Sequence, residues 1–161
     1  EEIRSMIGVL RNSGNEAETQ PTLGTERIAD LLDYACDAGL RVHADLSLYD
    51  AERVPAYADV ALFGIAREAI TNVVRHAQAQ NLWLWLQSAD ESVELSVEDD
   101  GTGWSPEGTY NENDTYADVA NGGNGIIGMV ERAKVLQGSC TVGNRPEGGF
   151  SVHVVLPLRE A

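Results

Sequence analysis

The sequence predicts an α/β (α+β) two-layer sandwich, in which a mixed and mainly antiparallel β-sheet is covered by helices on one face. Three observations support this fold class. Segments with the 3.6-residue period of an amphipathic helix are interspersed with segments in which apolar and polar residues alternate. Their order after a polar linker is α-β-α-β-β-loop-α-β-β, with no internal repeat. At 161 residues the chain is long enough to bury a sizeable core in one domain.

The N-terminal residues are expected to lie outside this domain. Residues 1–12 carry apolar side chains at i, i+3, i+4 and i+7, which predicts a helix. Residues 13–24 form a polar linker that contains Gly and Pro, and the domain is predicted to span residues 25–161. Because the chain begins with Glu1 rather than Met, we expect it to be part of a longer protein.

The first half of the domain is predicted to contain two helices and one strand. Thr25 is expected to cap a short helix that ends at Gly39, and residues 40–48 alternate as a strand. Pro55 suits the first turn of a long helix that reaches about Ala77. The buried stripe of this long helix is predicted to consist of Phe63, Ala66, Ile70, Val73 and Ala77.

The second half is predicted to contain four strands and one helix. Residues 81–88 and 91–99 alternate as two paired strands joined by a short turn. Residues 104–124 are polar, rich in Gly and Asn, and without periodicity, so they are predicted to form a long loop of the kind that is often functional. The remaining pattern predicts a helix and two strands over residues 125–138, 139–144 and 150–158.

The charge of the chain excludes one class of partner. Its formal net charge is −15, so a nucleic-acid backbone would be repelled. Nine acidic side chains and no Lys or Arg lie between Glu91 and Asp118. A phosphate ligand bound near this stretch would therefore need a metal ion to offset the negative field.

The composition also predicts the compartment of the domain. No apolar run approaches the length of a membrane span, so we expect no membrane contact by this domain. Cys36 and Cys140 lack metal-ligand spacing and lie in apolar-periodic segments. They are interpreted as reduced core residues of a cytoplasmic domain.

The first candidate motif lies at the end of the strand over 91–99. Val93, Leu95 and Val97 point inward, which makes Asp99 the next inward position, and a D-G-T-G sequence follows it. A buried carboxylate needs a partner, and glycines let a flat ligand approach the backbone. Such a site suits the amine and ring nitrogen of adenine. The alternative is that Asp99 simply ends the strand and caps a turn.

The second candidate motif lies on the long helix. Glu68, Asn72, Arg75 and His76 share one helix face. An acid, an amide, a guanidinium and an imidazole together could hold a hydrated cation and a phosphate chain. The alternative is a solvated helix face with pairs at i,i+4.

The third candidate motif is a glycine pattern before the last helix. Gly123, Gly125 and Gly128 match G-x-G-x-x-G, but the dinucleotide fingerprint requires a preceding strand, which the polar loop does not supply. The pattern then indicates a glycine hinge leading into a helix N-terminus, whose free N–H groups attract phosphate. The alternative is a flexible loop end followed by an ordinary amphipathic helix.

Taken together, the motifs resemble a known family. E-x-x-x-N-x-x-R-H-A over 68–77, D-x-G-x-G over 99–103 and G-x-G-x-x-G-M-x-E-R-A over 123–133 resemble the N, G1 and G2 boxes of the GHKL (Bergerat) ATP-binding fold. The similarity is greatest to the catalytic domain of sensor histidine kinases of the NarL/DesK-like branch. Residues 1–11 resemble the end of their dimerisation helix, and residues 138–158 resemble their closing pair of strands.

The resemblance implies roles for the matching residues. Asp99 would bind the adenine amino group, with Gly101 and Gly103 allowing close approach. Asn72 would hold the Mg²⁺ ion that bridges the ATP phosphates, and Glu68 would be the polar base near the transferred phosphate. The other residues implied to contact the nucleotide or to hinge a lid over about 104–124 are Arg75, His76, Gly123, Asn124, Gly125, Ile126, Gly128 and Met129.

Three features depart from the family pattern. Asn124 stands where many relatives carry His, which removes a cationic phosphate contact. Phe150 stands where a Thr is common, which removes a hydroxyl on the phosphate side. The lid is also longer and more acidic than is usual for this branch.

The resemblance implies a kinase whose acceptor lies elsewhere. The chain would transfer the γ-phosphoryl group of ATP to a His on the dimerisation domain of a homodimer, for relay to a response regulator. His43, His76 and His153 are not on a dimerisation helix, so the acceptor is expected upstream of this chain, and the chain alone is not expected to autophosphorylate. The full-length protein could be anchored in the plasma membrane. The alternatives are another GHKL member, such as an anti-sigma-factor serine kinase, or a degenerate binding module.

Overall fold

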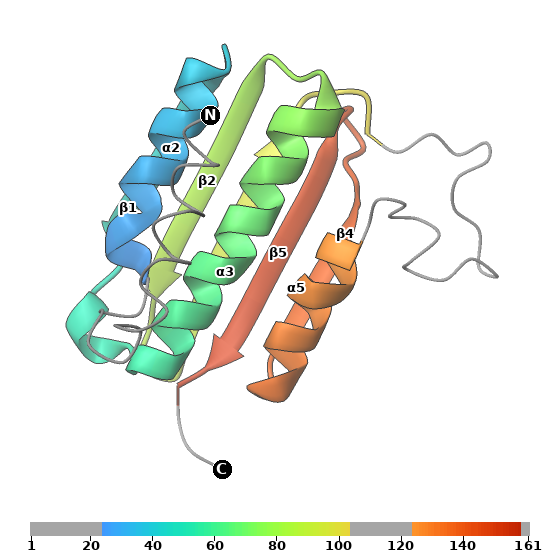
Figure 1. Ribbon diagram of the computed structural model, residues 1–161. Coiled ribbons are helices and arrows are strands. Elements are labelled where there is room, and N and C mark those ends of the chain that lie inside the picture. The colour runs from blue at the N-terminus through green and yellow to red at the C-terminus, as the bar shows by residue number, and fades with distance from the viewer. Residues whose placement is uncertain (1–23, 104–123, 159–161) are drawn as a thin grey trace, which may run out of the picture.

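The computed structural model describes residues 24–103 and 124–158. Within these residues, a five-stranded sheet forms one layer and three α-helices cover one of its faces (Figure 1). The helices are α2 (Ile28–Asp37), α3 (Ala56–Asn72) and α5 (Asn124–Val135). The strands are β1 (Arg41–Leu48), β2 (Asn81–Ser88), β3 (Ser92–Asp99), β4 (Ser139–Asn144) and β5 (Phe150–Pro157).

The sheet has the order β1-β2-β3-β5-β4. β1 and β2 are parallel, whereas the other three pairs of neighbours are antiparallel. The predicted fold class, the order of the elements and the antiparallel hairpin formed by β2 and β3 are therefore confirmed.

The core lies between the sheet and the helices. Alternate side chains of the three central strands are buried, as the period-2 pattern requires, namely Leu82, Leu84, Leu86, Val93, Leu95, Val97, Val152, Val154 and Leu156. α3 crosses the middle of this layer (Figure 1). All five residues of its predicted stripe are buried. The opposite face of the sheet carries no helix in the part of the chain that the structure describes.

The long helix ends differently from the prediction. The α-helical part stops at Asn72, and Val73–Ala77 form a π-helical turn, η4, followed by Gln78 in the left-handed region with φ 53°. Val73 and Ala77 still reach the core, Val74 is partly buried against it, and Arg75 and His76 are exposed. Single π-helical turns within α-helices occur frequently at functional sites.

Thr25 does not cap a helix as predicted. It is the first residue of a 3₁₀ turn, η2 (Thr25–Arg27), and the residue at the N-cap position is Gly24. The backbone N–H of Thr25 donates to Asp59 on α3 at 3.0 Å, and the hydroxyls of Thr25 and Tyr49 donate to the same carboxylate. A second 3₁₀ turn, η3 (Ala51–Arg53), follows β1. Because the N–H and the hydroxyl of Thr25 both donate to Asp59, they link the start of the domain to α3 and are not used to cap a helix.

The prediction that both cysteines are core residues is wrong for Cys36. This residue is exposed, because it lies on the solvent side of α2, one position after the buried Ala35. Cys140 is partly buried, and its burial raises the pKa of the thiol to about 11. Both cysteines are free thiols.

Several predicted segments lie outside the described residues. These are the helix over 1–12, the linker over 13–24 except for Gly24, and the lid over about 104–124 except for Asn124. Within residues 24–103 and 124–158, no helix combines the length and apolar character needed to cross a bilayer.

Candidate functional site

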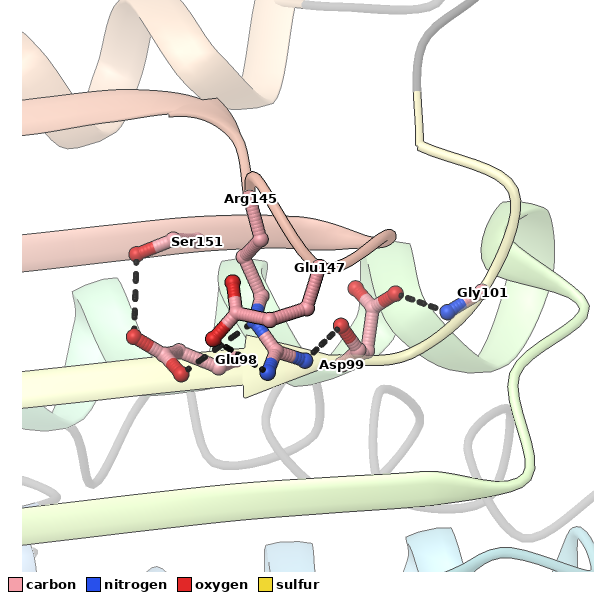
Figure 2. A network of polar contacts seen from close by, with 6 residues as sticks. All are labelled: Glu98, Asp99, Gly101, Arg145, Glu147 and Ser151. Carbon is pink, nitrogen blue, oxygen red and sulfur yellow. Dashed lines mark hydrogen bonds and ion pairs between the residues drawn. The ribbon is translucent and has the colours of Figure 1, made fainter.

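Asp99 is the central group of the candidate site. It is the last residue of β3, its side chain points to the helix-covered side of the sheet, and the residue is only 2% exposed. The backbone N–H of Gly101 donates to its Oδ1 atom at 2.7 Å (Figure 2). Burial raises the pKa of Asp99, and the backbone N–H groups of Gly101 and Phe150 act against this shift. The sequence prediction of a buried carboxylate at this position is confirmed.

The turn that follows Asp99 packs closely against backbone on two sides. A Cβ atom added to Gly101 would lie 2.0 Å from the carbonyl oxygen of Ala77, which also accepts from the N–H of Thr102 at 2.8 Å. Gly103 has φ +68°, and a Cβ there would lie 2.8 Å from Oδ1 of Asn144. Glycine is required at both positions for steric reasons. The turn therefore joins the end of η4 to the start of the β4–β5 connection.

Asp100 has a different role from its neighbour Asp99. Its Oδ1 accepts the backbone N–H groups of Gln80 and Asn81 at 2.9 and 2.8 Å, and its Oδ2 accepts Nδ2 of Asn81 at 2.9 Å. Although desolvation acts to raise the pKa of Asp100, these hydrogen bonds outweigh it and lower the pKa. Asp100 holds the turn against the start of β2. The sequence reasoning did not identify this role.

The predicted helix motif is divided between two elements. Glu68 and Asn72 lie one helical turn apart on α3 and are partly exposed, whereas Arg75 and His76 are exposed on η4. Ala77, the last residue of the motif, is the one that contacts the glycine turn. The structure therefore brings the C-terminal end of this motif to the turn after Asp99.

The described residues offer few side-chain ligands for a metal ion. They contain no group of three or more His, Cys, Asp or Glu side chains placed to bind a metal. Asn72 offers one amide oxygen. Mg²⁺ commonly takes few protein ligands and completes its octahedron with phosphate and water oxygens. A site built around Asn72 would consequently depend on a bound polyphosphate.

The glycine motif lies largely within α5. The helix begins at Asn124, one residue earlier than predicted, so Gly125 and Gly128 are helical, while Gly123 lies outside the described residues. A Cβ at Gly128 would lie 3.0 Å from Nη1 of Arg132, so this glycine leaves room for that guanidinium. Ile126 and Met129 are buried in the core. The role of the glycines as a lid hinge stays a prediction.

Arg145 belongs to the site although the sequence reasoning missed it. It lies in the β4–β5 connection, and its Nη1 donates to the backbone carbonyl of Asp99 at 2.8 Å (Figure 2). Its Nε is 3.5 Å from Oε1 of Glu98, and its Cζ is 5.0 Å from the ring centroid of Trp83. In the sequence Arg145 is only a cation in the turn R-P-E-G-G between two predicted strands, and no local pattern places it beside Asp99.

A family comparison agrees with this geometry. Residues 58–160 match the family of histidine kinase-, DNA gyrase B- and HSP90-like ATPases. The chain belongs to this family. The matched span begins in α3 and includes the turn after Asp99, α5 and the β4–β5 hairpin. The resemblance inferred from the three motifs is thereby confirmed.

Sensor kinases are found among the sequence relatives of this ATPase-family chain. It is 33% identical to the nitrate/nitrite sensor protein NarX of Escherichia coli, over 84% of this chain and 21% of that protein. It is 36% identical to the signal transduction histidine-protein kinase/phosphatase UhpB of Salmonella typhimurium, over 62% of this chain and 17% of that protein. The chain thus spans about a fifth of the length of these curated relatives.

Solved structures show the same fold. The histidine kinase domain of a blue-light activated histidine kinase from Erythrobacter litoralis matches with a TM-score of 0.59 and 22% identity, covering 81% of this chain and 60% of that one. The ATP-binding domain of PrrB from Mycobacterium tuberculosis matches with a TM-score of 0.51 and 24% identity, covering 83% of this chain and 95% of that one. The described domain therefore has the fold of these histidine kinase domains.

Proposed function

We propose that this chain binds ATP at Asp99 and serves as the catalytic domain of a sensor histidine kinase. The phosphoryl group would go to a His on the dimerisation domain of the same protein, and from there to a response regulator. One observation carries this proposal: a carboxylate that is almost completely buried at the end of β3, beside a turn in which glycine is sterically required. The similarity to NarX and UhpB supports it.

The geometry at Asp99 suits adenine better than a purely structural role. The adenine amino group is a donor, and an ionised carboxylate is an acceptor whose hydrogen bonds are strong. The desolvation of Asp99 is only partly offset by hydrogen bonds within the protein. A hydrogen-bond donor on a ligand would offset more of this desolvation cost, so the carboxylate would be more stable in the complex than in the free domain. A flat base could also lie directly against the backbone at Gly101 and Gly103.

Residues at the C-terminal half of α3 would act on the phosphates. Asn72 would bind the Mg²⁺ that accompanies ATP, and the ion would supply charge compensation in a chain of net charge −15. Arg75 and His76 are exposed on η4, from where they could approach the phosphate chain. Asn124 and Gly125 begin α5, and their helix N-terminus would attract phosphate.

Glu68 is proposed as the base of the transfer step. A bond forms between an imidazole nitrogen of the acceptor His and the γ-phosphorus while the bond to the β–γ bridging oxygen breaks, which leaves ADP. The attacking nitrogen is the one with the free lone pair, so the proton on the other ring nitrogen must then leave, and Glu68 would accept it. The rest of the catalysis would be positioning and electrostatic stabilisation, which dominate phosphoryl transfer. In its full-length protein the chain would act as a cytoplasmic domain.

The test is phosphoryl transfer in trans. The chain is incubated with radiolabelled ATP, alone and with the purified dimerisation segment of its own full-length protein. We expect no label on the chain and slow labelling of a His on the segment. Glu68→Gln should lower the rate and leave ATP affinity nearly unchanged, because Glu68 acts in transfer. The matched control is Glu94→Gln, since Glu94 is on β3 and pairs with His153. Acid-labile label on the chain alone would contradict the proposal.

A degenerate binding module is the second candidate. It is favoured by Asn124 in place of a cationic side chain, and by Phe150 in place of a hydroxyl. This candidate predicts that ATP binds at Asp99 and that no transfer to the dimerisation segment occurs. The same experiment therefore separates the two candidates, provided that ATP binding is measured in parallel.

A further inference from the structure

Arg145 is held in place by one stacking contact and two ion pairs. Its guanidinium lies over the ring of Trp83, with 5.0 Å between Cζ and the ring centroid. Its Nε is 3.5 Å from Glu98, and its Nη2 is 3.4 Å from Glu147. The side chain is only 14% exposed. Stacking and ion pairing on several sides restrict a guanidinium far more than a single surface ion pair does.

The third guanidinium nitrogen of Arg145 is directed at the backbone of Asp99, the proposed adenine ligand. Nη1 donates to the carbonyl oxygen of Asp99 at 2.8 Å, as Figure 2 shows. The same carbonyl is confined by Gly149, where an added Cβ would lie 1.8 Å from it. Asp100, the next residue, is tied to the start of β2 by three hydrogen bonds. The backbone of Asp99 is therefore clamped from the turn of the β4–β5 hairpin and from the start of β2.

We propose that Arg145 is a positioning residue for nucleotide binding, which fixes the backbone of Asp99 so that its carboxylate faces adenine. This inference rests on the proposed function, because it assumes that Asp99 binds the base. Trp83 lies on the sheet face away from the helices, since its neighbours Leu82 and Leu84 point into the core. Arg145 thus acts from the open face of the sheet on a residue that would contact the ligand from the helix-covered face.

The contacts explain why arginine is suited to this role. The planar guanidinium can stack on Trp83 and donate in several directions at the same time. A lysine could keep the charge and one hydrogen bond to the Asp99 carbonyl, but it could not also stack flat on the indole. Ion pairs alone would tolerate either residue. An Arg145→Lys variant therefore distinguishes a role that needs stacking on Trp83 from one that needs only a positive charge.

The experiment is a double-mutant cycle read by ATP affinity. Isothermal titration calorimetry is carried out on the wild-type chain and on the Asp99→Asn, Arg145→Ala and double variants, at protein concentrations that allow weakened binding to be measured. Arg145→Ala should weaken ATP binding by about five- to tenfold. In the Asp99→Asn background the same change should have little further effect, because Arg145 acts through Asp99. Arg145→Lys should recover only part of the affinity, because it keeps a hydrogen bond to the Asp99 carbonyl but loses the stacking on Trp83.

The matched control is Arg53→Ala. Arg53 pairs with Asp90 at the other end of β3 at 2.6 Å, so its removal changes the net charge equally without touching Asp99. It should leave ATP affinity unchanged. Circular dichroism and the melting temperature establish that each variant is folded. If Arg145→Ala is not, Arg145→Gln, which keeps the aliphatic stem, takes its place in the cycle.

The outcomes separate this inference from the proposed function. If Asp99→Asn weakens binding and Arg145→Ala does not, the positioning role is wrong and the adenine site stands. Additive losses would also overturn the inference, since Arg145 would then act independently of Asp99. If Asp99→Asn binds ATP as tightly as the wild type, the adenine assignment itself fails. If Arg53→Ala lowers ATP affinity as much as Arg145→Ala does, the loss is explained by the change in net charge and the positioning role is wrong.

Discussion

The charged side chains at the two ends of strand β3 differ in their exposure to solvent. At the start of the strand, Asp90 in the β2–β3 turn pairs with Arg53 at 2.6 Å, and the two side chains are 84% and 56% exposed. At the end of the strand, Asp99 is 2% exposed, and Arg145 holds its carbonyl rather than its carboxylate. The first pair has the better ion-pair geometry.

The difference shows that burial, rather than distance, determines what a charge does in this domain. An exposed ion pair loses most of its Coulomb attraction to water and contributes about 0–1 kcal/mol. A buried carboxylate forms strong electrostatic interactions, but its burial costs free energy unless hydrogen-bond donors compensate for the lost hydration. The exposed end of β3 is thus an ordinary turn, whereas the buried end holds a carboxylate whose desolvation is opposed by the backbone N–H groups of Gly101 and Phe150.

Gly149→Ala should destabilise the domain most. Gly149 has φ +101°, and its added Cβ would lie 1.8 Å from the carbonyl oxygen of Asp99. Backbone strain and overpacking together should lower the free energy of unfolding by about 3 kcal/mol. Urea denaturation followed by circular dichroism measures this. Gly143→Ala in β4 is the control, because nothing lies within 4 Å of its added Cβ, and a change there comparable to that of Gly149→Ala would refute the steric argument.

Asn72→Ala should weaken ATP binding in a magnesium-dependent manner. Loss of the one amide oxygen offered to the ion should lower the affinity about tenfold in Mg²⁺ buffer, or about 1.4 kcal/mol. In EDTA the wild type and the variant should bind nearly alike, because no ion is present. Calorimetric titrations in the two buffers provide the comparison. Equal losses in both would show that Asn72 does not contact the metal.

Asp99→Asn should change how the stability of the free domain depends on pH. Burial raises the pKa of folded Asp99 above its ordinary value of 3.8, so the native state keeps this proton to a higher pH than the unfolded chain does. The native state therefore loses stability as the pH rises from 3.8 through the raised pKa. Asparagine lacks this titration. The melting temperature of the variant relative to the wild type should consequently increase across that window and level off above it, and a constant difference would contradict the buried-charge argument.

Arg53→Ala should have the smallest effect on stability. Both members of the Arg53–Asp90 pair are largely exposed, so its removal should cost less than about 0.5 kcal/mol. The change in the urea midpoint should shrink further at high salt, because exposed charges are screened. A loss of several kcal/mol would mean that this end of β3 is not the weakly coupled region described above.

Much of the fold followed from hydrophobic periodicity. Strict alternation in β2 and β3 fixed which side chains point inward, and the same count identified Asp99 as a buried acid. The spacing of apolar residues likewise located α3 and its buried stripe. Side-chain direction is predictable in these cases because a regular backbone sets it.

Features that depend on contacts between distant residues were not predictable in this way. Arg145 is 46 positions from Asp99 in the sequence, and no local pattern indicates that a turn brings them together. The π-helical turn at Val73–Ala77 depends on backbone hydrogen bonding rather than on composition. Thr25 looked like a helix cap because the sequence does not show that Asp59 engages both its N–H and its hydroxyl.

Calorimetric titration of the Asp99→Asn variant with ATP and with ADP tests the central claim most directly. A hydrogen bond to a charged group contributes about 1.5–3 kcal/mol. The variant should therefore bind both nucleotides at least about tenfold more weakly than the wild type, and by similar factors, because both carry adenine. If the variant binds either nucleotide as tightly as the wild type, Asp99 is not the adenine ligand, and its burial has another cause.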